Sequence, residues 1–158
     1  MVVRTEPLQR NFSRGCSGVV GCGERPKSWS SAVAKSILVG PDIEKGAKIL
    51  QILDDAGLKV IVALWAFLPD YEDWRLILSG RKFEAAGLRG AYGLFHDTLD
   101  AAGFSLDDTP TVGIFRSSDP FIRSLRRLGK ARSTDGMRLG GRTFGDRFVE
   151  DAYAYRIS

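Results

Sequence analysis

The stretch "VIVALWAFLPDYEDWRLILSG", residues 60–80, decides the fold of this chain. Its first half is β-branched and aromatic, Pro69-Asp70 has the chemistry of a turn, and residues 74–78 form a second β-prone run. The stretch therefore predicts a β-hairpin. Apolar residues occupy both alternating faces of the first strand, so we expect this strand to lie inside a sheet that is covered on both sides.

Two tryptophans, Trp65 and Trp74, lie one on each predicted strand. As a cross-strand aromatic pair they would contribute about 0.5 to 1 kcal/mol to stability. The alternative is a platform on which a ligand stacks. We expect the pair to be buried in the core.

Three segments have the apolar periodicity of amphipathic helices. The first begins with Asp42 as its N-cap and ends at Gly57. The second covers residues 84–102, and the three glycines in its first half predict close backbone packing or an irregular start. Its apolar stripe includes Leu88. The third has Asp119 as its N-cap and ends at Gly129.

Further strands are predicted at residues 111–115, 136–139 and 146–157. The resulting order, αββαβαββ, predicts an α+β fold with about three helices packed on a mostly antiparallel sheet of about five strands.

The final strand has one expected face that carries a charge among apolar residues. Asp151 falls on this face, and we expect a basic residue of segment 116–147 to pair with it. The face is predicted to comprise Val149, Asp151, Tyr153, Tyr155 and Ile157.

Residues 1–36 show no helical or strand periodicity and are rich in Gly, Ser and Arg. They predict a disordered or loosely attached extension, followed by a single α+β domain at residues 37–158. Two interpretations remain open: a transit-like or regulatory extension, or a translation start further on, near residues 37–39.

The composition, 44% hydrophobic and 27% charged, is typical of a soluble folded domain. No apolar run approaches the roughly 18 to 20 residues of a membrane span, and the N-terminus lacks the apolar region of a secretory signal, so we expect a cytoplasmic protein without membrane contact. Cys16, Cys22 and His96 are too few ligands for a zinc site. We therefore expect no metal and no cofactor.

The net charge of +4 is unevenly distributed along the chain. Residues 37–115 hold seven basic and twelve acidic groups, whereas residues 116–147 hold nine and three. Arginines with glycine turns suit contacts with phosphates. Alternatively, cations near the third helix's C-terminus satisfy its dipole and pair with the acidic body. The candidate nucleic-acid-binding residues are Arg123, Arg126, Arg127, Lys130, Arg132, Arg138 and Arg142.

Two further features bear on catalysis. His96 lies four residues from both Tyr92 and Asp100, a row that could orient an imidazole as a base, but no nucleophile motif accompanies it, which favours a structural histidine. Acidic residues cluster in two places, where they could bind a divalent metal or form solvated turns. The clusters are Asp70, Glu72 and Asp73, and Glu150 with Asp151. We assign no catalytic residue.

From "GPDIEKGAKILQILDDAG" through "VALWAFLPDYEDWRLILSG" to "FVEDAYAYRIS", the chain resembles a group of small bacterial proteins of unknown function. The resemblance covers about residues 41–158. It implies a bacterial origin and a stand-alone domain, and it transfers no activity and no site residue.

Three functions are therefore considered. The first is a non-catalytic protein-interaction domain that binds a protein partner or forms a homo-oligomer through a sheet edge. The second is sequence-nonspecific nucleic-acid binding through segment 116–147. The third is a carboxylate-based, metal-dependent enzyme.

Overall fold

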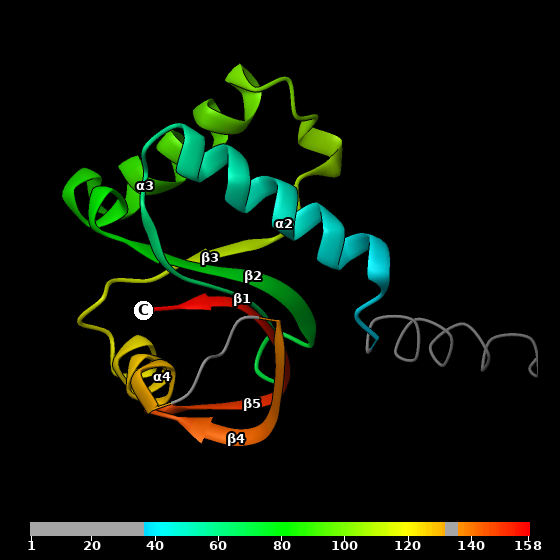
Figure 1. The fold of residues 1–158 in the computed structure, drawn as a ribbon, viewed down its shortest axis with the longest axis vertical. Helices are drawn as coiled ribbons and strands as arrows, with labels where there is room; N and C mark the ends of the chain where they lie inside the picture. The colour runs from blue at the N-terminus through cyan, green and yellow to red at the C-terminus, as the bar shows by residue number, and fades with distance from the viewer. Residues whose placement is uncertain (1–36, 132–135) are drawn as a thin grey trace, which may run out of the picture. The chain divides into compact units, whose positions relative to one another are not determined.

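The computed structural model describes residues 37–131 and 136–158. The predicted extension, with Cys16 and Cys22, lies outside these residues. The order of helices and strands in the described residues confirms the predicted α+β class (Figure 1). The elements are helices α2 (Gly40–Asp55), α3 (Arg81–Ala101) and α4 (Pro120–Ala131), the short 3-10 helix η3 (Leu106–Asp108), and strands β1 (Val60–Leu68), β2 (Asp73–Gly80), β3 (Val112–Ile114), β4 (Met137–Phe144) and β5 (Arg147–Ile157).

The five strands of this part of the chain form one sheet in the order β3-β2-β1-β5-β4. All neighbours are antiparallel except β2 and β3, which run parallel because α3 carries the chain back between them. β1 lies in the centre, as its two apolar faces predict. β3 and β4 are the edge strands.

Helices cover both faces of the sheet (Figure 1). α2 and α3 pack on one face, where Ile49 and Phe95 are fully buried, and α4 packs on the other, where Phe121 is fully buried. β1 supplies both cores in alternation, with Trp65 toward α2 and α3 and Leu64 toward α4.

The two tryptophans are buried, with 4% of Trp65 and 9% of Trp74 exposed, but they do not face each other. Trp65 lies opposite Leu76, and Trp74 lies opposite Phe67, with the ring centroids 5.7 Å apart. The predicted Trp-Trp pair is wrong because it assumes a two-residue turn at Pro69-Asp70. Such turns need a positive φ that proline cannot adopt, and the loop between β1 and β2 instead has four residues.

Two helix starts differ from the predictions. α2 begins at Gly40, and Asp42 lies in its first turn rather than at the N-cap. α3 begins at Arg81, and Gly87 interrupts it with a φ of 71°, which confirms the irregular start. The interruption turns Leu88 outward, so that this side chain is 64% exposed instead of joining the apolar stripe.

The start of α4 agrees with the prediction and its end does not. Asp119 Oδ1 accepts a hydrogen bond from the Phe121 N–H at 2.9 Å, as expected of an N-cap. The helix passes Gly129 and ends at Ala131. A Cβ at Gly129 would lie 2.5 Å from the Ile157 carbonyl oxygen, so glycine is needed there for close packing on β5.

β5 does not keep its expected residues on one face. Val149 and Ile157 pack toward α4, whereas Tyr153 and Tyr155 pack toward α2 and α3. An irregularity in the β1-β5 register explains the change of face between Tyr155 and Ile157. Ala63 and Leu64 lie opposite Arg156 and Ala154, so Tyr155 is an extra, unpaired residue. Alternation alone cannot predict such a bulge.

Candidate anion-binding site

The seven predicted cations do not gather at one point. Arg123 and Arg127 are exposed on α4, Arg126 is half-buried on the same helix, and Arg138 and Arg142 are exposed on β4. The side chain of Lys130 and the whole of Arg132 lie outside the described residues. α4 packs against both β4 and β5, so this part of the chain presents its charges around one face of the sheet.

Arg138 has a partner inside the protein. Its Nη2 lies 3.6 Å from Asp151 Oδ2, which confirms the predicted pairing of Asp151 with a basic residue of segment 116–147. This ion pair offsets the charge of Arg138 and makes it a weaker candidate for binding a ligand.

Arg126 lines a cavity of about 610 Å³ together with three other cations, Lys59, Arg81 and Lys82. The Nε of Arg126 donates a hydrogen bond of 2.7 Å to the main-chain oxygen of Ser158, which holds the guanidinium in place. No Asp or Glu is among the lining residues. They are Gly57, Leu58, Lys59, Ile61, Arg81, Lys82, Arg126 and Ser158.

Pairing of β1 with β2 brings the cavity's cations together. Val60 lies opposite Gly80 in the sheet, so Lys59, directly before β1, comes close to Arg81, directly after β2. The turn before Lys59 is set by Gly57, whose φ of 74° ends α2 in the left-handed conformation. α4, packed on the opposite face from α2 and α3, then supplies Arg126.

Arg81 and Lys82 lie at a position that is unfavourable for cations. They form the first turn of α3, where the helix dipole is positive, and the N-cap residue Gly80 offers no side chain to the free N–H groups. Cations here cost stability, by about 0.3 to 1 kcal/mol each at an exposed site. An anion bound in the cavity would offset this loss of stability, because it would attract both the cations and the positive end of the helix dipole.

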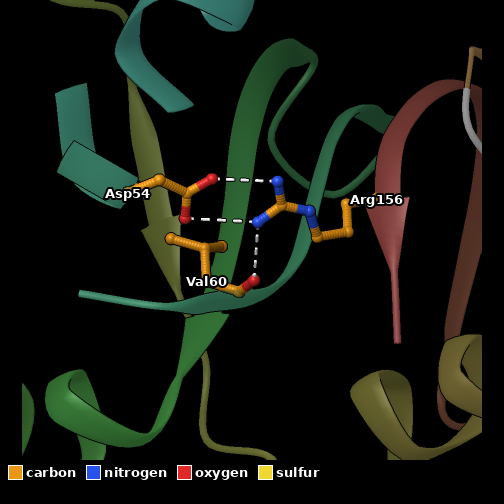
Figure 2. A network of polar contacts seen from close by, with 3 residues as sticks. All are labelled: Asp54, Val60 and Arg156. Carbon is orange, nitrogen blue, oxygen red and sulfur yellow. Dashed lines mark hydrogen bonds and ion pairs between the residues drawn. The ribbon is translucent and has the colours of Figure 1, made fainter. Parts of the chain in front are cut away.

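One aspartate outside the cavity, three residues before Gly57 of its lining, is already paired. Asp54, near the end of α2, is held by both terminal nitrogens of Arg156, at 2.9 Å and 3.2 Å, and one of these nitrogens also contacts the Val60 carbonyl at 3.3 Å (Figure 2). This arrangement ties α2 to the ends of β1 and β5. It leaves Asp54 unable to neutralise the lysines and arginines of the cavity.

Glu84 is the carboxylate whose charge acts on Arg126. Hydrogen bonds from Ser117 lower the pKa of Glu84, and the positive charges of Arg116 and Arg126 lower it further. Glu84 therefore stays ionised at neutral pH and offsets one of the nearby positive charges. Because its Oε1 accepts the Ser117 N–H, the carboxylate is directed to the loop before α4.

The acidic clusters and His96 do not assemble a catalytic centre. Asp73 Oδ1 accepts the Trp74 N–H at 2.9 Å, a local turn contact. In the described ranges, no three His, Cys, Asp or Glu side chains come close enough to hold a metal ion. The Tyr92 hydroxyl accepts the Ile114 N–H at 3.3 Å on β3, and the ring of His96 packs edge-on against Phe95.

A second cleft, of about 530 Å³, lies at the edge strand β3. Arg75, which lines the cleft, has its guanidinium 3.8 Å from the centre of the Tyr71 ring, and Arg147, outside the lining, has its guanidinium 5.1 Å from the centre of the Phe115 ring. Tyr71 and Leu88, at 42% and 64% exposed, give the cleft an apolar rim. This feature suits contact with a protein more than with a phosphate chain.

Both sheet edges carry features that oppose pairing with another strand. β3 has three residues, and one of its N–H groups is taken by the Tyr92 hydroxyl. β4 carries two arginines and the left-handed Gly141. Short, charged or kinked edges are common protections against edge-to-edge association. Assembly through an edge stays a prediction.

No family model, curated protein or solved structure matches this chain. Over residues 37–131 and 136–158, no helix is both long enough and apolar enough to cross a membrane. Because no matching protein suggests a function, the chemistry of the cavity is derived from its own residues.

Sequence reasoning missed Lys59, Arg81 and Lys82. They belong to a segment of negative net charge, and a charge count by segment hides local groups of cations. One signal was available. The Arg81-Lys82 pair lies between the predicted strand at residues 74–78 and the predicted helix at residues 84–102, and an earlier helix start would place both cations in its first turn.

Proposed function

We propose that this domain binds nucleic acid through its phosphates, at a cationic surface formed by the cavity and the outer face of α4. One observation carries the proposal. Arg126 of the basic segment shares a cavity with Lys59, Arg81 and Lys82, three cations of the otherwise acidic body, and the lining includes no Asp or Glu side chain, so that its one carboxylate is the main-chain end group of Ser158.

Charge energetics support this function. Like charges at short range repel each other, and a phosphate placed among them removes the repulsion while releasing the counterions of the nucleic acid. Arg123 and Arg127 extend the positive surface, because both are exposed and neither forms an ion pair with a described residue.

The expected binding is weak, insensitive to base sequence and steeply dependent on salt. The apolar side of α4, with Phe121, Ile122 and Leu125 fully buried, packs on the sheet, and its outward residues are mostly arginines that suit phosphates. For duplex DNA, each phosphate that the protein neutralises adds about 0.9 to the negative slope of log K against log salt.

The test is fluorescence anisotropy with a labelled duplex and a labelled single strand, from low to physiological salt. The double variant Arg123→Ala/Arg127→Ala should flatten the duplex slope by up to about 1.8. Arg89→Ala is the matched control, because Arg89 is equally exposed but lies on α3, beyond the interruption at Gly87. The slope of this control should equal that of the wild type.

Two results would contradict the proposal. One is the absence of binding to either nucleic acid at low salt. The other is a loss of binding per removed charge that is as large in the Arg89 control as in the α4 double variant, which would reduce the effect to net charge alone.

Contact with a protein partner or a second copy of this chain is the second candidate function. The exposed Tyr71 and Leu88 at the β3-edge cleft favour it. Sedimentation velocity over a range of protein concentrations tests self-association, which Leu88→Glu should weaken. Leu106→Glu is the control, because Leu106 is as exposed as Leu88 but does not line the cleft.

A further inference from the structure

We infer that the cationic cavity is a pocket for a phosphomonoester, supplied either by the phosphorylated end of a nucleic-acid strand or by a free mononucleotide. The strand-end source rests on the proposed function, whereas the chemistry of the pocket does not.

The charge of the cavity matches a phosphomonoester better than an internal phosphate. A phosphomonoester carries about −1.5 to −2 at neutral pH, whereas an internal phosphodiester carries a single charge. Four cations line the cavity, Asp54 is held by Arg156, and two positive charges are offset, one by Glu84 and one by the main-chain end group of Ser158, which leaves two. The excess that remains is greater than one diester neutralises.

Hydrogen-bond donors accompany this charge. Arg81 and Lys82 are the first residues of α3, and their main-chain N–H groups have no carbonyl partner within the helix. Such N–H groups, with the positive end of the helix dipole, bind phosphate oxygens when cationic side chains are present to hold the anion. Arg126 adds a guanidinium, which can contact two oxygens at once.

The size and walls of the cavity favour a ligand that carries a terminal phosphate. At about 610 Å³ it lies within the usual range for small-molecule pockets, and it exceeds the volume of a phosphate group alone. Its walls come from four parts of the chain: residues 57–61, the start of α3, Arg126 and Ser158. A terminal phosphate has one oxygen in an ester bond and three that can contact donors from these different walls, whereas an internal phosphate has only two such oxygens.

The uncharged lining allows contact with a sugar but offers no selection of a base. Leu58 and Ile61 are the apolar residues of the cavity, and none of its lining residues is aromatic or carries an amide side chain. Stacking on an aromatic ring and the paired amide contacts that read adenine therefore have no side-chain partner here, and the Arg and Lys side chains are engaged by the phosphate. The pocket should recognise a phosphorylated end whatever nucleotide carries it.

The first measurement uses the wild-type protein and free ligands. Adenosine 5′-monophosphate is titrated into isotope-labelled protein, and the backbone N–H signals of residues 80–82 are followed. We expect saturable shifts at these residues with the nucleotide and none with adenosine. The absence of such shifts would overturn the pocket.

The second measurement compares three single strands of one sequence, which carry a 5′-phosphate, a 3′-phosphate or only hydroxyl ends. We expect at least one phosphorylated strand to bind about tenfold more tightly than the hydroxyl strand, since charge-assisted hydrogen bonds to a dianion are strong. Lys59→Ala/Arg81→Ala, at two exposed positions, should abolish this ratio. Arg123→Ala/Arg127→Ala should weaken all three strands alike and keep the ratio.

The outcomes separate the pocket from the proposed function. Equal affinity for all three strands, with overall binding intact, would remove the strand-end source and leave the proposed function standing. If no strand binds but the nucleotide shifts residues 80–82, the pocket is supported, its source is the free mononucleotide, and the proposed function fails. If neither strand nor nucleotide binds, both proposals fail.

Discussion

The two faces of the sheet use their polar groups differently. On the α2 and α3 face, one chain of hydrogen bonds crosses the core: the Trp65 indole donates to the Tyr155 hydroxyl at 2.9 Å, and Tyr155 in turn donates to the Ile43 carbonyl. On the α4 face the core is apolar, and the arginines of α4 lie on its outer side. Substitutions on the first face should therefore change stability, and those on the outer side of α4 should change binding.

The Trp65-Tyr155 contact also explains the small residue of α2 that lies above it. Gly46 is buried, and a Cβ at this position would lie 2.6 Å from the indole nitrogen of Trp65 and would also overlap the Tyr155 hydroxyl. α2 can approach the sheet this closely only because the side chain is missing. The hydrogen bond and the glycine therefore form one packing unit.

The largest expected effect is that of Trp65→Ala. It should lower the free energy of unfolding by about 3 to 5 kcal/mol, because it leaves a cavity at the centre of the first core and removes the donor to Tyr155. Urea unfolding measures the change. Trp65→Phe, which keeps most of the volume, should cost less. An unchanged midpoint in the alanine variant would show that the ring contributes nothing to the core.

The next effect separates two glycines in helices. Gly46→Ala should destabilise the protein by about 1 to 3 kcal/mol through overpacking against Trp65 and Tyr155. Gly93→Ala should stabilise it by up to about 1 kcal/mol, because a Cβ there meets no atom within 4 Å and alanine is the better helix former. Thermal unfolding compares the two variants. Stabilisation by both would contradict the close approach of α2.

Tyr155→Phe should have a smaller effect, with a pH signature. Burial raises the pKa of Tyr155 from its usual 10.0 to about 12, so the unfolded chain loses this proton first and stability falls as the pH rises from 10 toward 12. The variant should lose about 1 kcal/mol at neutral pH, from its missing hydrogen bonds, and show a flatter decline in alkali. Equal alkaline slopes for variant and wild type would contradict this.

On the outer side of α4 the expected pattern is reversed. Arg123→Ala/Arg127→Ala should change the free energy of unfolding by no more than about 0.5 kcal/mol per site, because both side chains are exposed and form no ion pair with a described residue. The double variant should instead bind nucleic acid with a weaker dependence on salt. A large loss of stability would mean that these arginines hold the fold together.

The smallest effect is expected for His96→Ala. The residue lies on α3, its ring packs on Phe95, and it lines neither of the two clefts, so binding of nucleic acid and of nucleotide should be unchanged. Anisotropy and titration with adenosine 5′-monophosphate measure this. If a folded His96→Ala variant binds either ligand more weakly, the prediction is wrong and the histidine takes part in binding.

Sequence patterns were most informative where a property depends on neighbouring residues. The hairpin, the central position of β1 and the N-cap at Asp119 follow from alternation, apolar runs and capping chemistry. The pairing of Asp151 with a cation agrees with the prediction but not with its reason, because β5 does not keep the expected apolar face and the side chains of Arg138 and Asp151 are 58% and 38% exposed. Patterns were less informative at Gly129, whose role depends on the distance between α4 and β5.

The sequence by itself therefore determined the α+β class, the order of the elements and which segments are apolar enough to form a core. Only the tertiary structure decided the register that separates the two tryptophans, and the cavity that joins Lys59, Arg81 and Arg126. The physical reason is that periodicity is a local property of the chain. Which strands pair, and which face each helix covers, depends on how the whole domain buries its apolar surface, and these choices bring distant charges together.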